Sequence, residues 1–298
     1  MPSEQLKELL ALRRANAYRP EQTIEELRSG SAGCEPRTNT TVEAVDANGV
    51  YCEWIIHGEP ASDWVYVFFH GGGYYRGSAK ESRMVTSNLS ATCGCRCLTV
   101  DYRLAPEHPF PAALDDAYTV YAWLLDQGVA ANRIVIGGSS AGGGLAASLL
   151  AKLKMEEGPL PAGAALLSPW ADLTQSASTF ETNAASDPTI SKAYLDRMAA
   201  LYLNGQDARD PLASPVYSDL SGLPPILVQA GKLETMFGDS VSFFERAQAA
   251  GVDARLEAYD DVPHGWHNSA HLFPDMPEMW KAFDGIGRFV KGLFQDSK

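Results

Sequence analysis

The most informative segment of the chain, residues 133–144, reads RIVIGGSSAGGG. A short β-branched apolar run meets a Gly-x-Ser-x-Gly pentapeptide, and a helix-like run follows. Strand, sharp turn and helix form the context of a nucleophile elbow. The strained central residue of such a turn needs small neighbours, and Gly138 and Gly142 flank Ser140 at two positions on each side. The pattern therefore predicts an exposed Ser140 hydroxyl at a strand end, with the backbone N–H of Ala141 directed at the same point.

Two other interpretations of this segment stay open from its own residues. Ser139 is a second candidate for the central serine, with Gly137 and Ala141 beside it, although only the Ser140 register has glycine on both sides. The segment is also compatible with a glycine-rich turn that only packs a helix on a strand, because short motifs match by chance. The rest of the chain has to decide between them.

Composition and charge exclude several classes of protein. The chain has 298 residues, of which 45% are hydrophobic and 20% charged, as in a globular protein with a large core. Its formal charge of −13 argues against nucleic-acid partners and anionic membranes, and weakly favours neutral or cationic substrates. The N-terminus is a charged amphipathic pattern without the apolar core of a signal peptide, and no run is long enough to span a bilayer. We therefore expect a cytoplasmic protein that has no membrane partner.

The five cysteines do not predict a disulfide framework, because their number is odd and no secretory signal is recognised. Cys93, Cys95 and Cys97 alternate with other residues, which on a strand would place three thiols on one face. A metal site is one interpretation of that spacing. No fourth ligand lies nearby in sequence, so buried strand thiols are the favoured one.

Strand and helix patterns alternate along most of the chain. This alternation predicts a parallel sheet with helices on both faces. Residues 1–40 are expected to form N-terminal cap helices, and residues 41–298 a catalytic domain. The interval of about 172–222 is too long for a simple crossover and predicts a cap insertion beside the site, with a helix near 192–203. The expected strands are 41–45, 50–56, 65–69, 97–100, 134–137, 164–167, 226–230 and 254–259.

A glycine-rich segment, HGGGY at residues 70–74, directly follows the apolar strand at 65–69. Its glycines free the backbone to direct N–H groups at one point, where they can hold a developing oxyanion. This segment is a known partner of the nucleophile elbow. A phosphate-binding loop is the alternative, but the Lys-Ser/Thr pair of a P-loop is missing. We expect the oxyanion donors to be Gly72, Gly73 and Ala141.

The candidate base is His264, which follows the last expected strand in the segment VPHGW. Pro263 and Gly265 indicate a loop, as suits a catalytic imidazole. His264, His267 and His271 also have a spacing that binds metal on a helix, but the proline and glycine disfavour a helix there. We therefore expect no metal and no organic cofactor.

The base needs an acid that holds its tautomer. Glu234 lies just past the strand at 226–230, and Asp239 follows five residues later. Glu234 is favoured, and Asp239 remains the alternative. The order Ser140, Glu234, His264 is that of the α/β-hydrolases.

These motifs together resemble the hormone-sensitive-lipase-like family of α/β-hydrolases, the bacterial family IV esterases. The resemblance covers residues from about 40 to the C-terminus and implies an α/β-hydrolase fold, with a mostly parallel eight-stranded sheet and a helical cap. Two positions depart from the family pattern, since Ser139 stands where Asp or Thr is usual and Glu234 where Asp is common. The matching segments are 70–73, 102–112, 140–143, 168–170, 223–225 and 264–265.

The resemblance implies a serine carboxylesterase that hydrolyses short- to medium-chain esters through an acyl-enzyme. Tyr74, Trp170 and Tyr202 are the expected substrate-binding aromatics, although aromatic residues are more often part of a core. The resemblance also implies that the protein can form a homodimer. A lactonase or amidase with the same triad is the enzymatic alternative. A non-catalytic ligand-binding receptor on this fold is disfavoured because the histidine is present.

Overall fold

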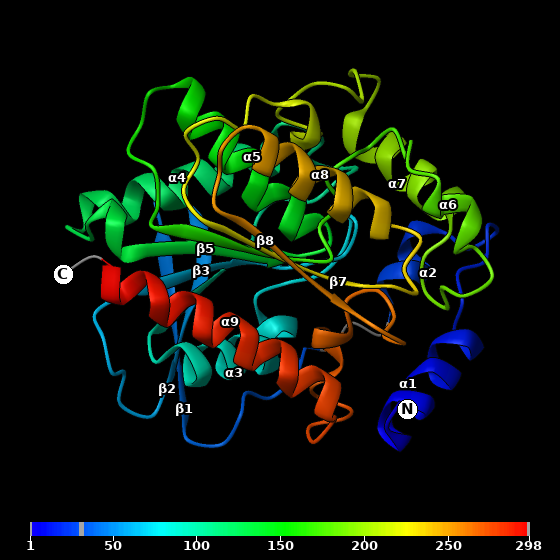
Figure 1. Cartoon of the computed structure of the whole chain (residues 1–298), viewed down its shortest axis with the longest axis horizontal. Coiled ribbons are helices and arrows are strands. Elements are labelled where there is room, and N and C mark those ends of the chain that lie inside the picture. The colour runs from blue at the N-terminus through cyan, green and yellow to red at the C-terminus, as the bar shows by residue number, and fades with distance from the viewer. Residues whose placement is uncertain (1, 30–32, 297–298) are drawn as a thin grey trace.

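The computed structural model describes residues 2–29 and 33–296. Within these ranges one sheet has the strand order β1-β2-β4-β3-β5-β6-β7-β8 (Figure 1). The β1–β2 and β2–β4 pairs are antiparallel, and the other neighbours are parallel. The strands are β1 Thr40–Ala47, β2 Val50–His57, β3 Val65–Phe69, β4 Arg96–Val100, β5 Ile134–Ser139, β6 Gly163–Leu167, β7 Ile226–Gly231 and β8 Ala254–Tyr259. The mostly parallel eight-stranded sheet expected from the sequence is therefore confirmed.

The central strands are buried on both faces, and their sequences are mostly apolar. Every residue of β3, β5, β6 and β7 is buried, as a parallel sheet covered by helices requires. Alternation along β3 divides the core, since Val65, Val67 and Phe69 pack on one face and Tyr66 and Phe68 on the other.

Helices cover both faces of the sheet (Figure 1). In this view α3 and α9 lie below the sheet, and α4, α5 and α8 lie above it. Their bounds are α3 Arg83–Cys93, α4 Ala112–Asp126, α5 Ala141–Met155, α8 Phe237–Ala249 and α9 Pro277–Asp296. Short 3₁₀ turns complete the chain at η1 Lys80–Ser82, η2 Ala131–Arg133, η3 Pro215–Tyr217 and η4 Trp266–Ser269.

Four further helices gather at one end of the sheet (Figure 1). Arg197, in the helix at residues 192–203, contacts the N-terminal segment. It donates hydrogen bonds to Tyr18 Oη and to the carbonyl oxygen of Gln22. The bounds of these helices are α1 Glu4–Ala15, α2 Ile24–Arg28, α6 Thr179–Thr182 and α7 Lys192–Leu203. The helix expected near 192–203 is thus present. The division into a cap at 1–40 with an insertion at 172–222 stays a prediction, and residues 1 and 30–32 of that cap lie outside the described ranges.

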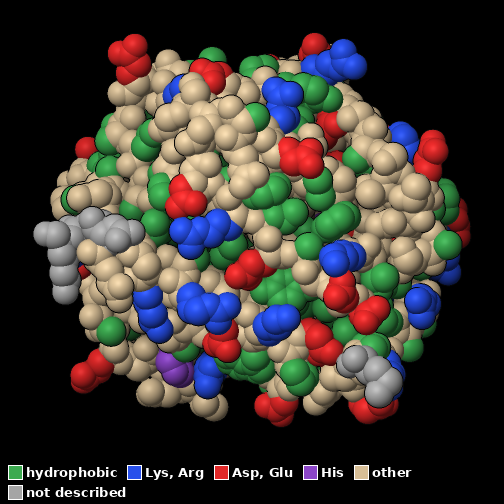
Figure 2. Space-filling model, in the orientation of Figure 1, with side chains coloured by type: hydrophobic (Ala, Val, Ile, Leu, Met, Phe, Trp, Pro, Cys, Tyr) green, Lys and Arg blue, Asp and Glu red, His purple; other side chains and the backbone are tan. Residues whose placement is uncertain are grey.

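The expectation for the cysteines was partly wrong. Cys93 ends α3 and only Cys97 lies in a strand, although all three thiols of the 93–97 segment are buried and free. Among the described residues, no group of His, Cys, Asp or Glu is arranged to hold a metal ion. The described helices also include none with the length and apolar character to cross a membrane. Acidic and basic side chains are interspersed on the face shown in Figure 2.

Candidate active site

The elbow between β5 and α5 has the strained turn that the sequence predicts. Ser140 has φ 56° and ψ −119°, and α5 begins at the next residue. A Cβ on Gly142 would overlap the carbonyl oxygen of Phe69, and one on Gly138 would overlap that of Gly142. The Ser140 N–H donates to Leu167 O at 2.8 Å. Only glycine therefore fits two positions before and two positions after Ser140. The hydrogen bond to Leu167 fixes the turn against the neighbouring strand β6.

Ser139 does not share the exposure of Ser140. It is the last residue of β5, fully buried, and its hydroxyl accepts a hydrogen bond of 2.9 Å from Asn268 Nδ2. Ser140, in contrast, lines a pocket. The geometry favours the Ser140 register. It also gives Ser139 a bond to the segment that follows His264.

Three side chains from separate strand ends are joined by hydrogen bonds. Ser140 Oγ lies 2.9 Å from His264 Nε2, and His264 Nδ1 lies 2.9 Å from Glu234 Oε2. An ionised carboxylate only accepts, so it holds the proton on Nδ1 and leaves Nε2 free to take the serine proton. The second carboxylate oxygen, Oε1, accepts from Gly231 N at 2.5 Å and Ser168 Oγ at 2.6 Å. Hydrogen bonds to both of its oxygens thus fix the orientation of the Glu234 carboxylate.

Asp239, the alternative acid, makes no hydrogen bond to the histidine. Its carboxyl is 1% exposed, and neither oxygen has a hydrogen-bond partner among the described residues. Burial, followed by the charge of Asp172, raises the pKa of Asp239 well above its usual range. A neutral carboxylic acid is a poor partner for an imidazolium, so the geometry favours Glu234.

The loop after β3 is fixed by contacts of His70, while the N–H groups of its glycines remain without hydrogen-bond partners among the described residues. His70 stacks on Tyr102 with ring centroids 4.1 Å apart, and Tyr102 Oη donates to His70 O at 2.7 Å. Gly72 and Gly73 have φ values of 118° and 60°, and no hydrogen bond among the described residues is donated by their N–H groups. Ala141 is the first residue of α5, so its N–H has no partner within the helix. All three expected donors are available for an oxyanion.

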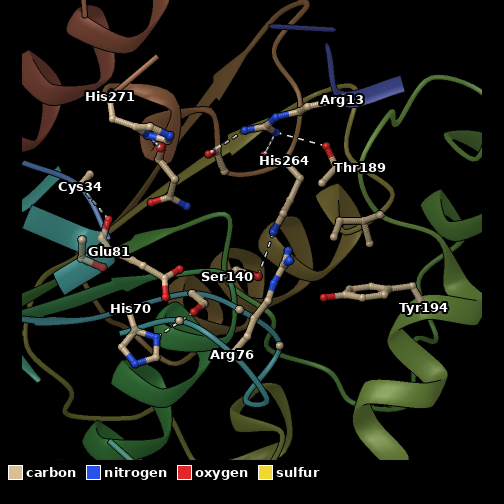
Figure 3. Close-up of a pocket in the computed structure, with 18 of the residues that line it drawn as sticks. Arg13, Cys34, His70, Arg76, Glu81, Ser140, Thr189, Tyr194, His264 and His271 are labelled. Atoms are coloured by element: carbon tan, nitrogen blue, oxygen red, sulfur yellow. Dashed lines mark hydrogen bonds between the residues drawn. The ribbon is translucent and has the colours of Figure 1, made fainter. Parts of the chain in front are cut away.

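A pocket of about 410 Å³ opens over Ser140 and His264 (Figure 3). The oxyanion loop forms one side, and residues of α1 and α7 close it from the helical end of the molecule. Its lining is mixed, with polar and apolar surface in nearly equal shares. The side chains that line it include Arg13, His70, Arg76, Glu81, Ser140, Thr189, Ile190, Tyr194, Leu195, His264, Asn268 and His271.

The three aromatic residues expected to bind substrate lie elsewhere. Tyr74, Trp170 and Tyr202 are at most 1% exposed, belong to the core, and are absent from the pocket lining. Tyr74 and Tyr202 stack with centroids 3.8 Å apart, and the ring of Trp170 lies 5.9 Å from that of Tyr74. The core interpretation of these aromatics is the one that the structure supports. Tyr194 of α7 lines the pocket instead.

Arg13 is a site residue that the sequence did not indicate. From α1 it donates hydrogen bonds to the carbonyl oxygens of His264 and Gly265, to Ser269 Oγ at 2.9 Å and to Thr189 Oγ1 at 3.2 Å. Burial lowers the pKa of this guanidinium to about 10, so it remains charged at neutral pH. In the sequence it is one of many charges on an amphipathic helix, with no local pattern to set it apart.

The other two histidines of the metal alternative do not join the triad. His267 Nε2 lies 3.0 Å from Gln229 Oε1 in the core, and burial, followed by the charges of His264 and Arg13, lowers the pKa of His267 to about 3. His271 Nδ1 lies 3.0 Å from the carbonyl oxygen of Asn268.

The sheet, the elbow and the three bonded side chains define an α/β-hydrolase with a serine-hydrolase site. A family model described as alpha/beta hydrolase fold matches residues 66–268. An acetyl-hydrolase of Streptomyces hygroscopicus is 40% identical over 76% of this chain and 74% of its own. An esterase of Acinetobacter venetianus is 36% identical over the same shares.

Solved structures extend the similarity to nearly the whole chain. An esterase from the bacterial hormone-sensitive lipase family is 41% identical, with a TM-score of 0.92 over 98% of this chain and 99% of that one. An esterase/lipase from an uncultured bacterium is 36% identical, with a TM-score of 0.93 over the same shares. The chain belongs to the hormone-sensitive-lipase-like family of α/β-hydrolases.

Proposed function

We propose that this protein is a serine carboxylesterase that hydrolyses short- to medium-chain carboxylic esters through an acyl-enzyme on Ser140. The observation that carries the proposal is the series of 2.9 Å hydrogen bonds from Ser140 through His264 to Glu234 at the floor of an open pocket. The relatives named acetyl-hydrolase and esterase support the reaction class.

The geometry accounts for each step of this reaction. His264 Nε2 takes the Ser140 proton as the hydroxyl oxygen attacks the acyl carbon. The N–H groups of Gly72, Gly73 and Ala141 hold the oxyanion of the tetrahedral intermediate. His264 then protonates the leaving alcohol and later activates water, which releases the acid. Glu234 stabilises the imidazolium in both halves of the cycle.

The test is labelling with a fluorophosphonate and turnover of p-nitrophenyl butyrate. We expect Ser140→Ala to lose labelling and at least about 10³-fold of kcat, and Ser139→Ala to keep its label. Labelling of folded Ser140→Ala protein would place the nucleophile elsewhere. A folded wild-type protein that takes no label would favour a ligand-binding receptor.

The same kind of triad can also cleave lactones and activated amides, so a lactone and an activated amide are assayed beside p-nitrophenyl butyrate. We expect esters to be the best substrates. A higher kcat/KM for a lactone or an amide would identify the protein as a lactonase or amidase instead.

We also propose a cytoplasmic location and a homodimer. All five cysteines are free thiols, as in proteins of reducing compartments. Strand β8 is an edge of the sheet, and its outer backbone groups are a surface on which a second copy can pair. Light scattering tests the dimer, and fractionation of cells that make the protein tests the location.

A further inference from the structure

The pocket over the triad contains two guanidinium groups. Arg13 enters from α1 and Arg76 from the loop after the oxyanion glycines, and Glu81 is the one carboxylate among the described lining residues. In Figure 3 Arg13 lies above His264 and Arg76 points from below toward Ser140. The overall charge of the chain is −13, whereas guanidiniums outnumber carboxylates among the described side chains that line the pocket.

Arg76 has most of its hydrogen-bonding capacity unused. An arginine carries five N–H donors, and the described residues give Arg76 a single acceptor, Leu27 O at 3.2 Å from Nη1. Its guanidinium lies 5.6 Å from the ring centre of Tyr75. No carboxylate of the described residues lies within ion-pair distance of it, and its side chain is exposed. Arg76 therefore presents a charged donor set to whatever enters the pocket.

Other arginines of this chain show the contrast. Arg28 forms two short bonds with Glu107, and Arg83 two with Glu53. Arg13 also lacks a carboxylate partner among the described residues, but its donors are committed to the loop that carries the catalytic histidine. Of the two pocket arginines, Arg76 is the one free to bind a ligand.

We infer that Arg76 selects esters that carry a carboxylate, and that this site prefers anionic esters to neutral ones of the same shape. The inference rests on the proposed esterase function and specifies its substrate class. A guanidinium binds a carboxylate through two parallel charge-assisted hydrogen bonds, which are stronger than neutral ones. Arg13 adds a second positive charge within the same pocket. Glu81 lies near Arg76, and the charges of Asp187 and Glu234 act on Arg13, so Arg76 is the guanidinium on which the preference depends.

Two matched pairs of substrates test the preference and show which side of the ester carries the charge. Mono-4-nitrophenyl glutarate against 4-nitrophenyl pentanoate places the carboxylate on the acyl side. 4-Acetoxybenzoate against its methyl ester places it on the alcohol side. The measured quantity is the ratio of kcat/KM for the anionic ester to that for the neutral one. We expect a ratio well above one for one of the two pairs in the wild type.

Substitutions then assign the preference to Arg76. Arg76→Met should lower the ratio about five- to tenfold, a range that allows for the exposure of the guanidinium. Arg76→Lys should retain part of the preference for the anionic ester, and added NaCl should reduce that preference. Arg14→Met is the matched control, because this exposed arginine of α1 lies outside the pocket and its loss changes the net charge equally. We expect its ratio to equal that of the wild type.

The inference would be overturned if, in the wild type, kcat/KM for each anionic ester were no higher than that for its neutral partner. It would also be overturned if Arg76→Met changed the ratio by less than twofold. In either case continued hydrolysis of the neutral esters would leave the esterase function intact. Failure to hydrolyse any of the four esters would contradict the proposed function itself.

Discussion

Replacing the carboxylate of Glu234 by an amide should abolish most of the turnover without unfolding the protein. Glu234→Gln keeps the size of the side chain, but the amide can present an N–H₂ group to His264 Nδ1 and favour the wrong tautomer. It also removes the negative charge that stabilises the imidazolium formed when Ser140 gives up its proton.

The expected loss follows from the distance between the two groups. Unit charges 2.9 Å apart, the separation of Glu234 Oε2 and His264 Nδ1, attract by about 6 kcal/mol at an effective dielectric constant of about 20. Because each 1.36 kcal/mol corresponds to a factor of ten in rate, kcat should fall roughly 10⁴-fold.

The assay is kcat for p-nitrophenyl butyrate, with a thermal melt of each variant to show that it is folded. Asp239→Asn is the matched control, because this buried carboxyl lies five residues from Glu234 and makes no hydrogen bond to the histidine. We expect it to retain activity within about threefold. A folded Glu234→Gln protein with more than a tenth of the wild-type kcat, or an equal loss in Asp239→Asn, would refute the reasoning.

Three further changes probe the support of the site. Arg13→Met should lower kcat roughly 10–100-fold, because the loop that carries His264 loses the bonds that position it. Burial lowers the pKa of His267 to about 3 in the folded chain, below its unfolded value of about 6.5. The free energy of unfolding should therefore fall as the pH drops below 6.5, by about 2 kcal/mol at pH 5. Urea titrations at several pH values should show that His267→Gln removes this loss. Gly142→Ala should destabilise the fold by roughly 1–3 kcal/mol and prevent phosphonate labelling, because its methyl group meets the carbonyl of Phe69.

Each of these changes has a control nearby. Arg14→Met, on the same helix as Arg13, should leave kcat unaltered. His267→Gln is compared with His271→Gln, which replaces the exposed histidine that bonds to the carbonyl oxygen of Asn268. Gly292→Ala, in α9 with open space around the added methyl, should be neutral or slightly stabilising. Equal effects in a variant and its control would show that the stated contact is not the cause.

Much of the fold and the candidate triad could be predicted from the sequence because their signals are local. An apolar run such as 65–69 has the length and composition of a buried strand, and Gly138 and Gly142 mark a turn that tolerates no side chain at either position. In a parallel sheet the strand ends meet at one edge. Ser140 directly follows β5, and Glu234 and His264 lie three and five residues past the ends of β7 and β8, so the topology brings all three to the same edge of the sheet.

The substrate pocket could not be predicted in the same way, because its wall comes from segments whose positions depend on packing. The expected aromatics Tyr74, Trp170 and Tyr202 are ordinary large apolar side chains in the sequence, and only the assembled core shows that they stack on one another. Arg13 and Arg76 likewise have no pattern that separates them from surface charges.

The sequence by itself determined the order of the strands and helices along the chain, the elbow and the candidates for the triad, since backbone sterics and hydrophobic periodicity act over a few neighbours. Only the tertiary structure decided that Glu234 rather than Asp239 reaches His264. It also decided that Ser139 bonds to Asn268, and that a chain of negative charge has arginines around its nucleophile. The Ser139–Asn268 bond joins residues 129 positions apart, and Glu234 and Asp239 are only five positions apart in sequence, so three-dimensional packing alone selects these contacts.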